Sequence, residues 1–176
     1  MSSLKVPISA SDHVEGNPKA ACTLVEYGDY QCPHCGHAYP IVKRIQKHFG
    51  DKLRFAFRNF PLNEIHPEAE SAAETAEFAA AHGKFSGMHD GLFENQLSLG
   101  IGLYQELAEE LGLDPAALRE ALKLGKFRER VRADFTGGVR SGVNGTPTFF
   151  INGQRHDGSF DFDTLVEAID AALGAE

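Results

Sequence analysis

The sequence predicts an α/β fold in which a small mixed sheet, built from a βαβ unit and a ββα unit, carries an inserted all-helical domain. Three observations lead to this prediction: a strand–helix–strand pattern over 21–57, a long helical stretch over 66–141, and a strand pair followed by a helix at the carboxyl end. The corresponding limits are 1–62 for an amino-terminal arm and the first half of the sheet domain, 63–141 for the inserted helices, and 142–176 for the second half.

The first unit begins with a buried strand. Residues 21–28 are mostly β-branched and apolar and end at a glycine. An apolar residue recurs every four positions over 41–49, which indicates a helix, and Pro33 suits its first turn. Pro40 falls inside this helix and predicts a kink. Apolar and polar residues then alternate over 53–57, as is typical of a second strand.

The helical stretch is divided by glycines, and Asp114-Pro115 predicts a helix start with an N-cap and a first-turn proline. Three apolar stripes have helical spacing and are assigned to core packing: Phe85, Met88 and Leu92; Leu103, Leu107 and Leu111; Phe127, Val131, Phe135 and Val139. His66 is expected at a helix start, and His82 and His89 on helix surfaces.

The carboxyl-terminal unit predicts a hairpin and a closing helix. Residues 148–151 favour a strand, and Asn152-Gly153 is a strong hairpin signal before a returning strand over 154–156. Apolar residues over 162–173 then follow a helical period.

Composition narrows the range of functions. The chain has 176 residues, of which 42% are hydrophobic and 24% charged, as in an ordinary globular domain. A net charge of −8 argues against a nucleic-acid partner or an anionic membrane surface. No apolar run reaches the roughly 18 residues of a membrane span. The first twenty residues hold no signal-peptide core, which favours the cytoplasm, or the periplasm or another exported location if a signal was removed.

The three cysteines are Cys22, Cys32 and Cys35, and the last two form a Cys-x-x-Cys between a strand and a helix. A helix N-terminus stabilises a thiolate, so Cys32 is expected to be the nucleophile. His34 is expected to stabilise that thiolate further. Cys35 lies one helical turn deeper and is expected to be the resolving thiol.

The alternative to redox chemistry is a metal site made with His34 and His37. A structural zinc site needs four ligands, usually in two pairs, and the sequence has no second pair. Haem attachment requires a histidine directly after the second cysteine, where Gly36 stands. We therefore expect neither a metal nor another cofactor, and we assign Cys22 to the core.

Cys32-Pro33-His34-Cys35, together with Gly145-Thr146-Pro147-Thr148 before the second strand pair, resembles the DsbA-type branch of the thioredoxin superfamily. The resemblance covers 21–173 and implies the thioredoxin fold with its helical insertion. The chain departs from thioredoxins in having Gln31, not a tryptophan, before the first cysteine.

The resemblance also implies roles for particular residues. Pro147 would be a cis-proline facing the dicysteine, and Thr146 would offer backbone groups to an extended substrate peptide. Glu26 would be a buried acid that exchanges a proton with Cys35. The basic residue that often pairs with this acid is left open between Arg54 and Arg58.

The sequence therefore predicts a thiol:disulfide oxidoreductase that exchanges a Cys32–Cys35 disulfide with cysteine-containing proteins or peptides and depends on a further redox partner. One alternative is a glutathione-dependent transferase or isomerase on the same fold. Another is a non-catalytic, chaperone-like module that binds peptides beside Pro147.

Overall fold

The computed structural model describes residues 2–174, and its centre is a five-stranded mixed sheet. The strands are β1 (His13–Gly16), β2 (Cys22–Gly28), β3 (Leu53–Asn59), β4 (Thr148–Ile151) and β5 (Gln154–Arg155). Their order in the sheet is β1-β3-β2-β4-β5. Only β2 and β3 are parallel, which is the βαβ unit predicted from the sequence.

The carboxyl-terminal hairpin forms at the predicted turn. β4 and β5 pair antiparallel with Ile151 opposite Gln154. Asn152 and Gly153 both have positive φ angles, 47° and 81°, as the tight hairpin turn requires. On its other side β4 pairs antiparallel with β2, with Tyr27 opposite Thr148.

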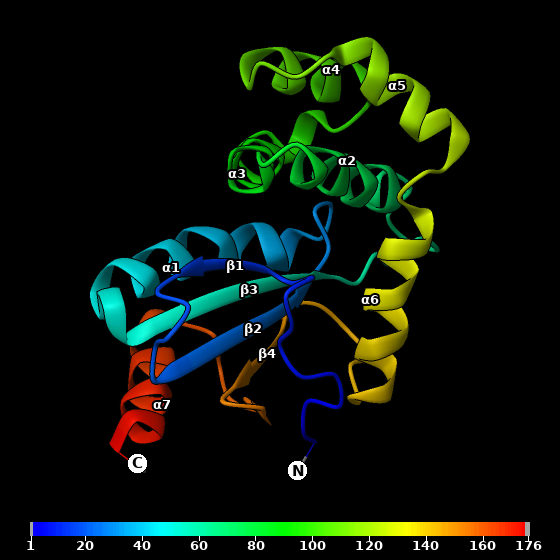
Figure 1. The fold of residues 1–176 in the computed structure, drawn as a ribbon. Helices are drawn as coiled ribbons and strands as arrows, with labels where there is room; N and C mark the ends of the chain where they lie inside the picture. Colours follow the sequence, from blue (N-terminus) through cyan, green and yellow to red (C-terminus); the bar gives the residue numbers. More distant parts are fainter. Residues whose placement is uncertain (1, 175–176) are drawn as a thin grey trace.

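Helices cover both faces of the sheet (Figure 1). One face carries α1 (Pro33–Phe49) and α7 (Phe162–Gly174), which contact each other. Between β3 and β4 lie α2 (Ala69–Ala81), α3 (Phe85–Glu94), α4 (Ile101–Glu110), α5 (Pro115–Leu124) and α6 (Arg128–Arg140). Short 3₁₀ turns, η1 (Gly50–Lys52) and η2 (Gln96–Ser98), follow α1 and α3. The predicted mixed sheet with inserted helices is confirmed.

Two apolar clusters hold these layers together. The larger one joins α1 and α7 to the helical insertion and contains Leu24, Ile45, Met88 and Ile169. The smaller one, on the opposite face of the sheet, is built around Val25, Tyr27 and Phe150. Alternate residues of β2 therefore enter different cores, as the period of a strand dictates.

The amino-terminal arm, residues 2–12, runs along the smaller cluster and reaches the far edge of the sheet. The Leu4 N–H donates to the Gly153 carbonyl at 2.8 Å, and Ser3 forms a β-bridge with Gln154. The Arg58 guanidinium donates to the carbonyls of Val6 and Pro7. The arm then leads into β1, which pairs with β3 at the other edge.

Two predictions about the helices are wrong. His89 is buried, because its imidazole packs against Phe57 and Phe93 and accepts or donates a 2.8 Å hydrogen bond with the Tyr30 hydroxyl. Val139 is exposed, because the buried face of α6 runs through Val131, Asp134 and Gly138, and Val139 lies outside it. Asp114, by contrast, caps α5 as predicted and accepts a hydrogen bond from the Ala116 N–H.

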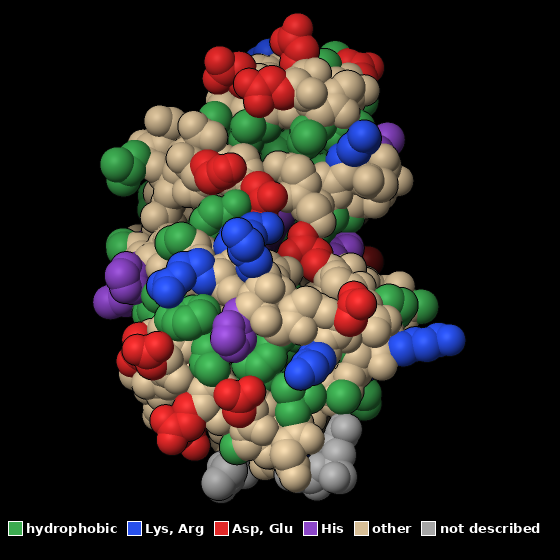
Figure 2. All heavy atoms as spheres, turned by 90° about the vertical axis from the view of Figure 1, so that its left-hand side faces the viewer, with side chains coloured by type: hydrophobic (Ala, Val, Ile, Leu, Met, Phe, Trp, Pro, Cys, Tyr) green, Lys and Arg blue, Asp and Glu red, His purple; other side chains and the backbone are tan. Residues whose placement is uncertain are grey.

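On the face that Figure 2 shows, acidic side chains lie at the end formed by α4 and α5 and also near the middle and the opposite end, while most of the Lys and Arg side chains lie near the middle. Within residues 2–174, no α-helix combines the length and the apolar character needed to cross a bilayer.

Candidate active site

The dicysteine lies where the sheet meets the first turn of α1. Cys32 is the N-cap residue with an extended backbone (φ −67°, ψ 123°), and Pro33 takes the first helical position. The Cys32 N–H donates to the Asp29 carbonyl, and the Gly36 N–H donates to the Cys32 carbonyl at 3.0 Å. This turn directs the free N–H groups of the helix end toward the Cys32 sulfur.

The surroundings of Cys32 favour a thiolate. The Cys35 thiol, the Thr146 hydroxyl and the backbone N–H groups of Cys35 and His34 lower the pKa of Cys32 to about 5, although partial burial opposes them. The Thr146 carbonyl oxygen, 3.6 Å from the Cys32 sulfur, accepts a hydrogen bond only from the thiol form, so the donors named above act against it. At neutral pH the sulfur is therefore ionised and ready to attack or to leave.

Cys35 has the opposite environment. Its side chain is fully buried, and burial raises its pKa well above the ordinary value for a thiol. Its contact with Cys32 and the nearby charge of Glu26 raise that pKa further. The backbone N–H of Asp29 lies 3.4 Å from the Cys35 sulfur and opposes the rise. Cys35 therefore holds its proton at neutral pH.

Glu26 projects from β2 into this buried region. Burial, followed by the charge of Cys32, raises the pKa of its carboxyl to about 8. Its Oε2 atom has no hydrogen-bond partner among the described residues. Neither candidate basic partner bonds to it: Arg58 pairs with Asp12 and the Tyr27 hydroxyl, and Arg54 with Thr23. A buried carboxyl of this kind can exchange a proton near neutral pH.

Of the remaining predicted residues, Thr146 lies against the Cys32 sulfur. The Thr146–Pro147 peptide bond is cis, and Cys32 lies against the Thr146 carbonyl. The Thr146 hydroxyl oxygen accepts or donates no other hydrogen bond among residues 2–174. The His34 side chain is exposed. The structure thus brings Cys32, Cys35, Glu26 and Thr146 together.

Sequence reasoning missed Asp29. This buried carboxylate accepts hydrogen bonds from the Gln31 and Leu62 N–H groups and lies 2.7 Å from His66 Nδ1. It fixes the loop before Cys32 to the loop that follows β3. Its only sequence signal is its place directly after a buried strand and shortly before the dicysteine.

Sequence reasoning also missed Gln96, which reaches the active-site turn from η2. Its Nε2 atom donates to the Tyr30 carbonyl at 2.9 Å and to the Cys32 carbonyl at 2.8 Å. A glutamine 64 positions after Cys32 carries no sequence pattern that predicts this contact.

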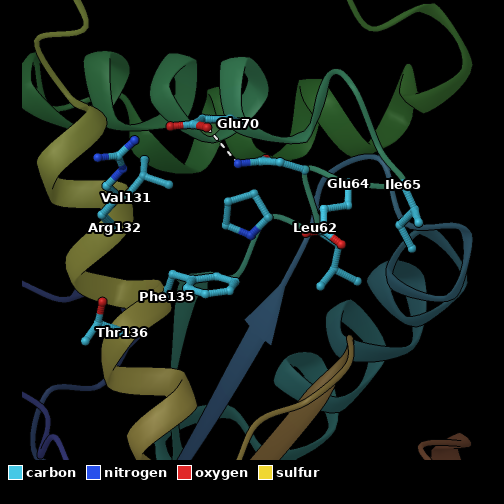
Figure 3. A pocket seen from close by; sticks show the side chains of 10 residues that line it. Leu62, Glu64, Ile65, Glu70, Val131, Arg132, Phe135 and Thr136 are labelled. Carbon is cyan, nitrogen blue, oxygen red and sulfur yellow. Dashed lines mark hydrogen bonds between the residues drawn. The ribbon is translucent and has the colours of Figure 1, made fainter.

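A cavity of about 630 Å³ lies between α6 and the loop that follows β3. Val131 and Phe135 line one side of it, and Leu62 and Ile65 the other (Figure 3). Its lining includes neither Cys32 nor Pro147. Across residues 2–174, no cluster of three or more His, Cys, Asp or Glu side chains is arranged to hold a metal ion.

Comparisons with known proteins match the whole fold. The thioredoxin family profile covers residues 9–171. Oxidised BdbD from Bacillus subtilis has a similar structure, with a TM-score of 0.89 and 28% identity over 98% of each chain. Wolbachia pipientis α-DsbA1 shares the fold, with a TM-score of 0.83 and 22% identity over 98% of this chain and 95% of that one.

The curated relatives are longer proteins. A Na⁺/H⁺ antiporter NhaA 1 from Salinispora arenicola is 42% identical over 171 residues, which are 97% of this chain and 26% of that protein. The chain thus spans about a quarter of the length of the curated relatives it matches.

Proposed function

Because this chain belongs to the thioredoxin family and has the fold of a DsbA-type thiol:disulfide oxidoreductase, we propose that it oxidises cysteine pairs in protein or peptide substrates through a Cys32–Cys35 disulfide. The contrast between the two thiols carries this proposal. The pKa of Cys32 is lowered to about 5, whereas that of Cys35 is raised. Such a pair favours the reduced protein, and so makes its disulfide an oxidant.

The reaction has two exchange steps. A substrate thiolate attacks the Cys32 sulfur, the Cys32–Cys35 bond breaks, and Cys35 leaves and takes a proton. The carboxyl of Glu26 supplies this proton, because its pKa of about 8 keeps it protonated at neutral pH. A second substrate thiolate then attacks the substrate sulfur of the mixed disulfide. Cys32 leaves as a stable thiolate, the substrate gains a disulfide, and the protein keeps two electrons.

Thr146 and Pro147 form the proposed substrate contact. The backbone at Thr146 lies against Cys32, so a peptide bound along it in extended form brings its own cysteine to the reactive sulfur. Pro147 offers no N–H at this place. His34, exposed at the start of α1, is proposed to stabilise the thiolate when a substrate covers it.

The compartment sets the direction of turnover. In an oxidising, exported location a redox partner reoxidises the dithiol by accepting its two electrons. In a reducing cytoplasm the same site is kept as a dithiol and acts as a reductase.

Oxidation of a dithiol peptide by the oxidised protein tests the proposal. The wild-type protein is expected to convert one peptide per dicysteine, and Cys32→Ser to convert none. When reduced Cys35→Ser is given a peptide that already carries a disulfide, Cys32 attacks that disulfide and a peptide thiolate leaves, and the mixed disulfide is expected to accumulate because no Cys35 thiol releases it. Cys22→Ala, in the buried first position of β2, is the matched control and should react like wild type. Peptide binding without oxidation would instead support a non-catalytic, chaperone-like module.

A further inference from the structure

Gln96 connects the helical insertion to the reactive turn. Its amide is held by η2, directly after α3, and η2 is fixed by the Asn95 side chain, which donates to the Gly91 carbonyl at 2.8 Å. Gln96 binds the Tyr30 carbonyl and the Cys32 carbonyl. These two groups lie on either side of the segment that contains Gln31 and the nucleophilic Cys32. One amide group therefore uses both of its hydrogens on the same turn.

Gly36 explains how the amide comes so close. A Cβ atom at Gly36 would lie 2.9 Å from the Gln96 amide carbon and closer still to its Oε1 atom. Gly36 does not adopt a positive φ angle, so the backbone of α1 does not itself require glycine there. The space that the missing side chain leaves is occupied by Gln96.

We propose that Gln96 is a positioning residue of the oxidoreductase site, which holds the Tyr30–Cys32 turn so that the helix N–H groups stay directed at the Cys32 sulfur. The inference rests on the proposed function in taking Cys32 as the reactive thiol. The two amide hydrogens of Gln96 also reduce the partial negative charge that the Tyr30 and Cys32 carbonyls present to the sulfur. This favours the Cys32 thiolate. The insertion thus sets the reactivity of a cysteine in the sheet domain.

The pH dependence of Cys32 alkylation tests this role, because a merely structural contact would lower stability without moving it. Gln96→Ala is expected to raise the midpoint of the alkylation profile by roughly 0.5–1 pH unit. Gln96→Met, which keeps the length of the side chain and removes the amide, should raise it equally. Leu97→Ala changes the neighbouring, fully exposed residue of η2 and should leave the midpoint unchanged.

A double-mutant cycle with Gly36 sharpens the test. Gly36→Ala displaces the amide and should reproduce the upward shift of the midpoint. In the Gln96→Ala background the added methyl group has room, so Gly36→Ala should add less than about 0.2 pH unit.

Midpoints within about 0.2 pH unit of wild type in both Gln96 variants, or additive shifts in the cycle, would overturn the inference. If Gln96→Ala does not fold, Gln96→Met and Gly36→Ala decide the question. Dithiol oxidation by the wild-type protein tests the proposed function separately, because the alkylation midpoint is measured whether or not a peptide is oxidised.

Discussion

Two buried glutamates in this molecule have the same burial and opposite surroundings. Glu26 on β2 is 3% exposed and Glu77 on α2 is 4% exposed. Glu26 leaves Oε2 without a partner among the described residues, and its pKa rises to about 8 because of burial and Cys32. Burial would also raise the pKa of Glu77, but a hydrogen bond from His13 and the charge of Arg130 lower it.

The difference shows how this protein separates stability from chemistry. Glu77 bonds to His13, Asn59 and Arg130, and so joins β1, β3, α2 and α6. A buried carboxylate with three partners is structural. Glu26, beside the dicysteine, lacks such partners and keeps its proton available for transfer.

The largest expected effect is the loss of the Glu77 network. Glu77→Ala leaves Arg130, His13 and Asn59 without their shared acceptor and should lower the free energy of unfolding by about 3–4 kcal/mol. Urea denaturation at pH 7 measures this loss. The folded fraction should still oxidise a dithiol peptide at the wild-type rate, and a slower rate would mean that the network also serves the chemistry.

Glu26→Gln should raise the free energy of unfolding at pH 7, whereas Glu77→Ala lowers it. Glu26 ionises in the unfolded chain near its ordinary pKa of 4.5 but in the folded protein only near 8. The wild-type protein therefore loses stability as the pH rises from 4.5 toward 8. At pH 7 the buried carboxyl lowers the free energy of unfolding by about 3 kcal/mol relative to pH 4.5. This value is 1.36 kcal/mol for each of the 2.5 pH units above 4.5.

Urea denaturation across this pH range checks the sign. The free energy of unfolding of Glu26→Gln should exceed that of wild type at pH 7 and should not fall over this range. Glu77 contributes the reverse slope, because its lowered pKa adds stability that is lost as the pH falls through its folded-state value. If Glu26→Gln were less stable than wild type at pH 7, the Glu26 carboxylate would have to be stabilised in the folded protein, and its raised pKa would be contradicted.

In free-energy terms, the effect of Glu26 on the rate of mixed-disulfide formation is expected to be smaller than its effect on stability. Without its proton the departure of Cys35 from the disulfide slows, so Glu26→Gln should form the mixed disulfide about 10–100-fold more slowly near pH 7. Stopped-flow mixing with a monothiol peptide isolates this step. Glu77→Gln is the matched control, and equal rates in the two variants would remove the proton-transfer role from Glu26.

Arg130→Met is expected to have the smallest effect. Arg130 bonds to Glu77 and Asp134 but is 27% exposed, so its loss should lower the free energy of unfolding by about 1 kcal/mol. Raising the salt concentration should reduce the difference from wild type. A loss above about 3 kcal/mol would show that Arg130, and not Glu77, organises the network.

Local sequence patterns predicted the backbone well. Pro33 begins α1, Asn152-Gly153 makes the hairpin, and Asp114 caps α5, because each acts through its own few residues. The buried position of Glu26, by contrast, was implied by the resemblance to DsbA-type proteins and not by strand periodicity, since both faces of β2 are buried.

Contacts between distant segments could not be predicted in this way. Arg58 binds Asp12 in the amino-terminal arm, a choice that depends on how the arm crosses the sheet. His89 lies on a helix whose pattern suggested a surface, but it is buried where α3 docks against Tyr30. The Gln96 contact depends on the same docking, which no local period encodes.

The amino-terminal arm has a consequence for self-association. An exposed sheet edge offers unpaired backbone groups to a strand of another molecule. In this chain the Leu4 N–H bonds to the Gly153 carbonyl and the Arg155 N–H to the Ser2 carbonyl, so residues 2–4 cover the β5 edge. The same segment continues into β1, which covers β3 at the opposite edge with four residues and ends at Gly16. One short stretch of chain thus supplies the outermost backbone at both sides of the sheet, and on the β1 side the edge left open to another molecule is only four residues long.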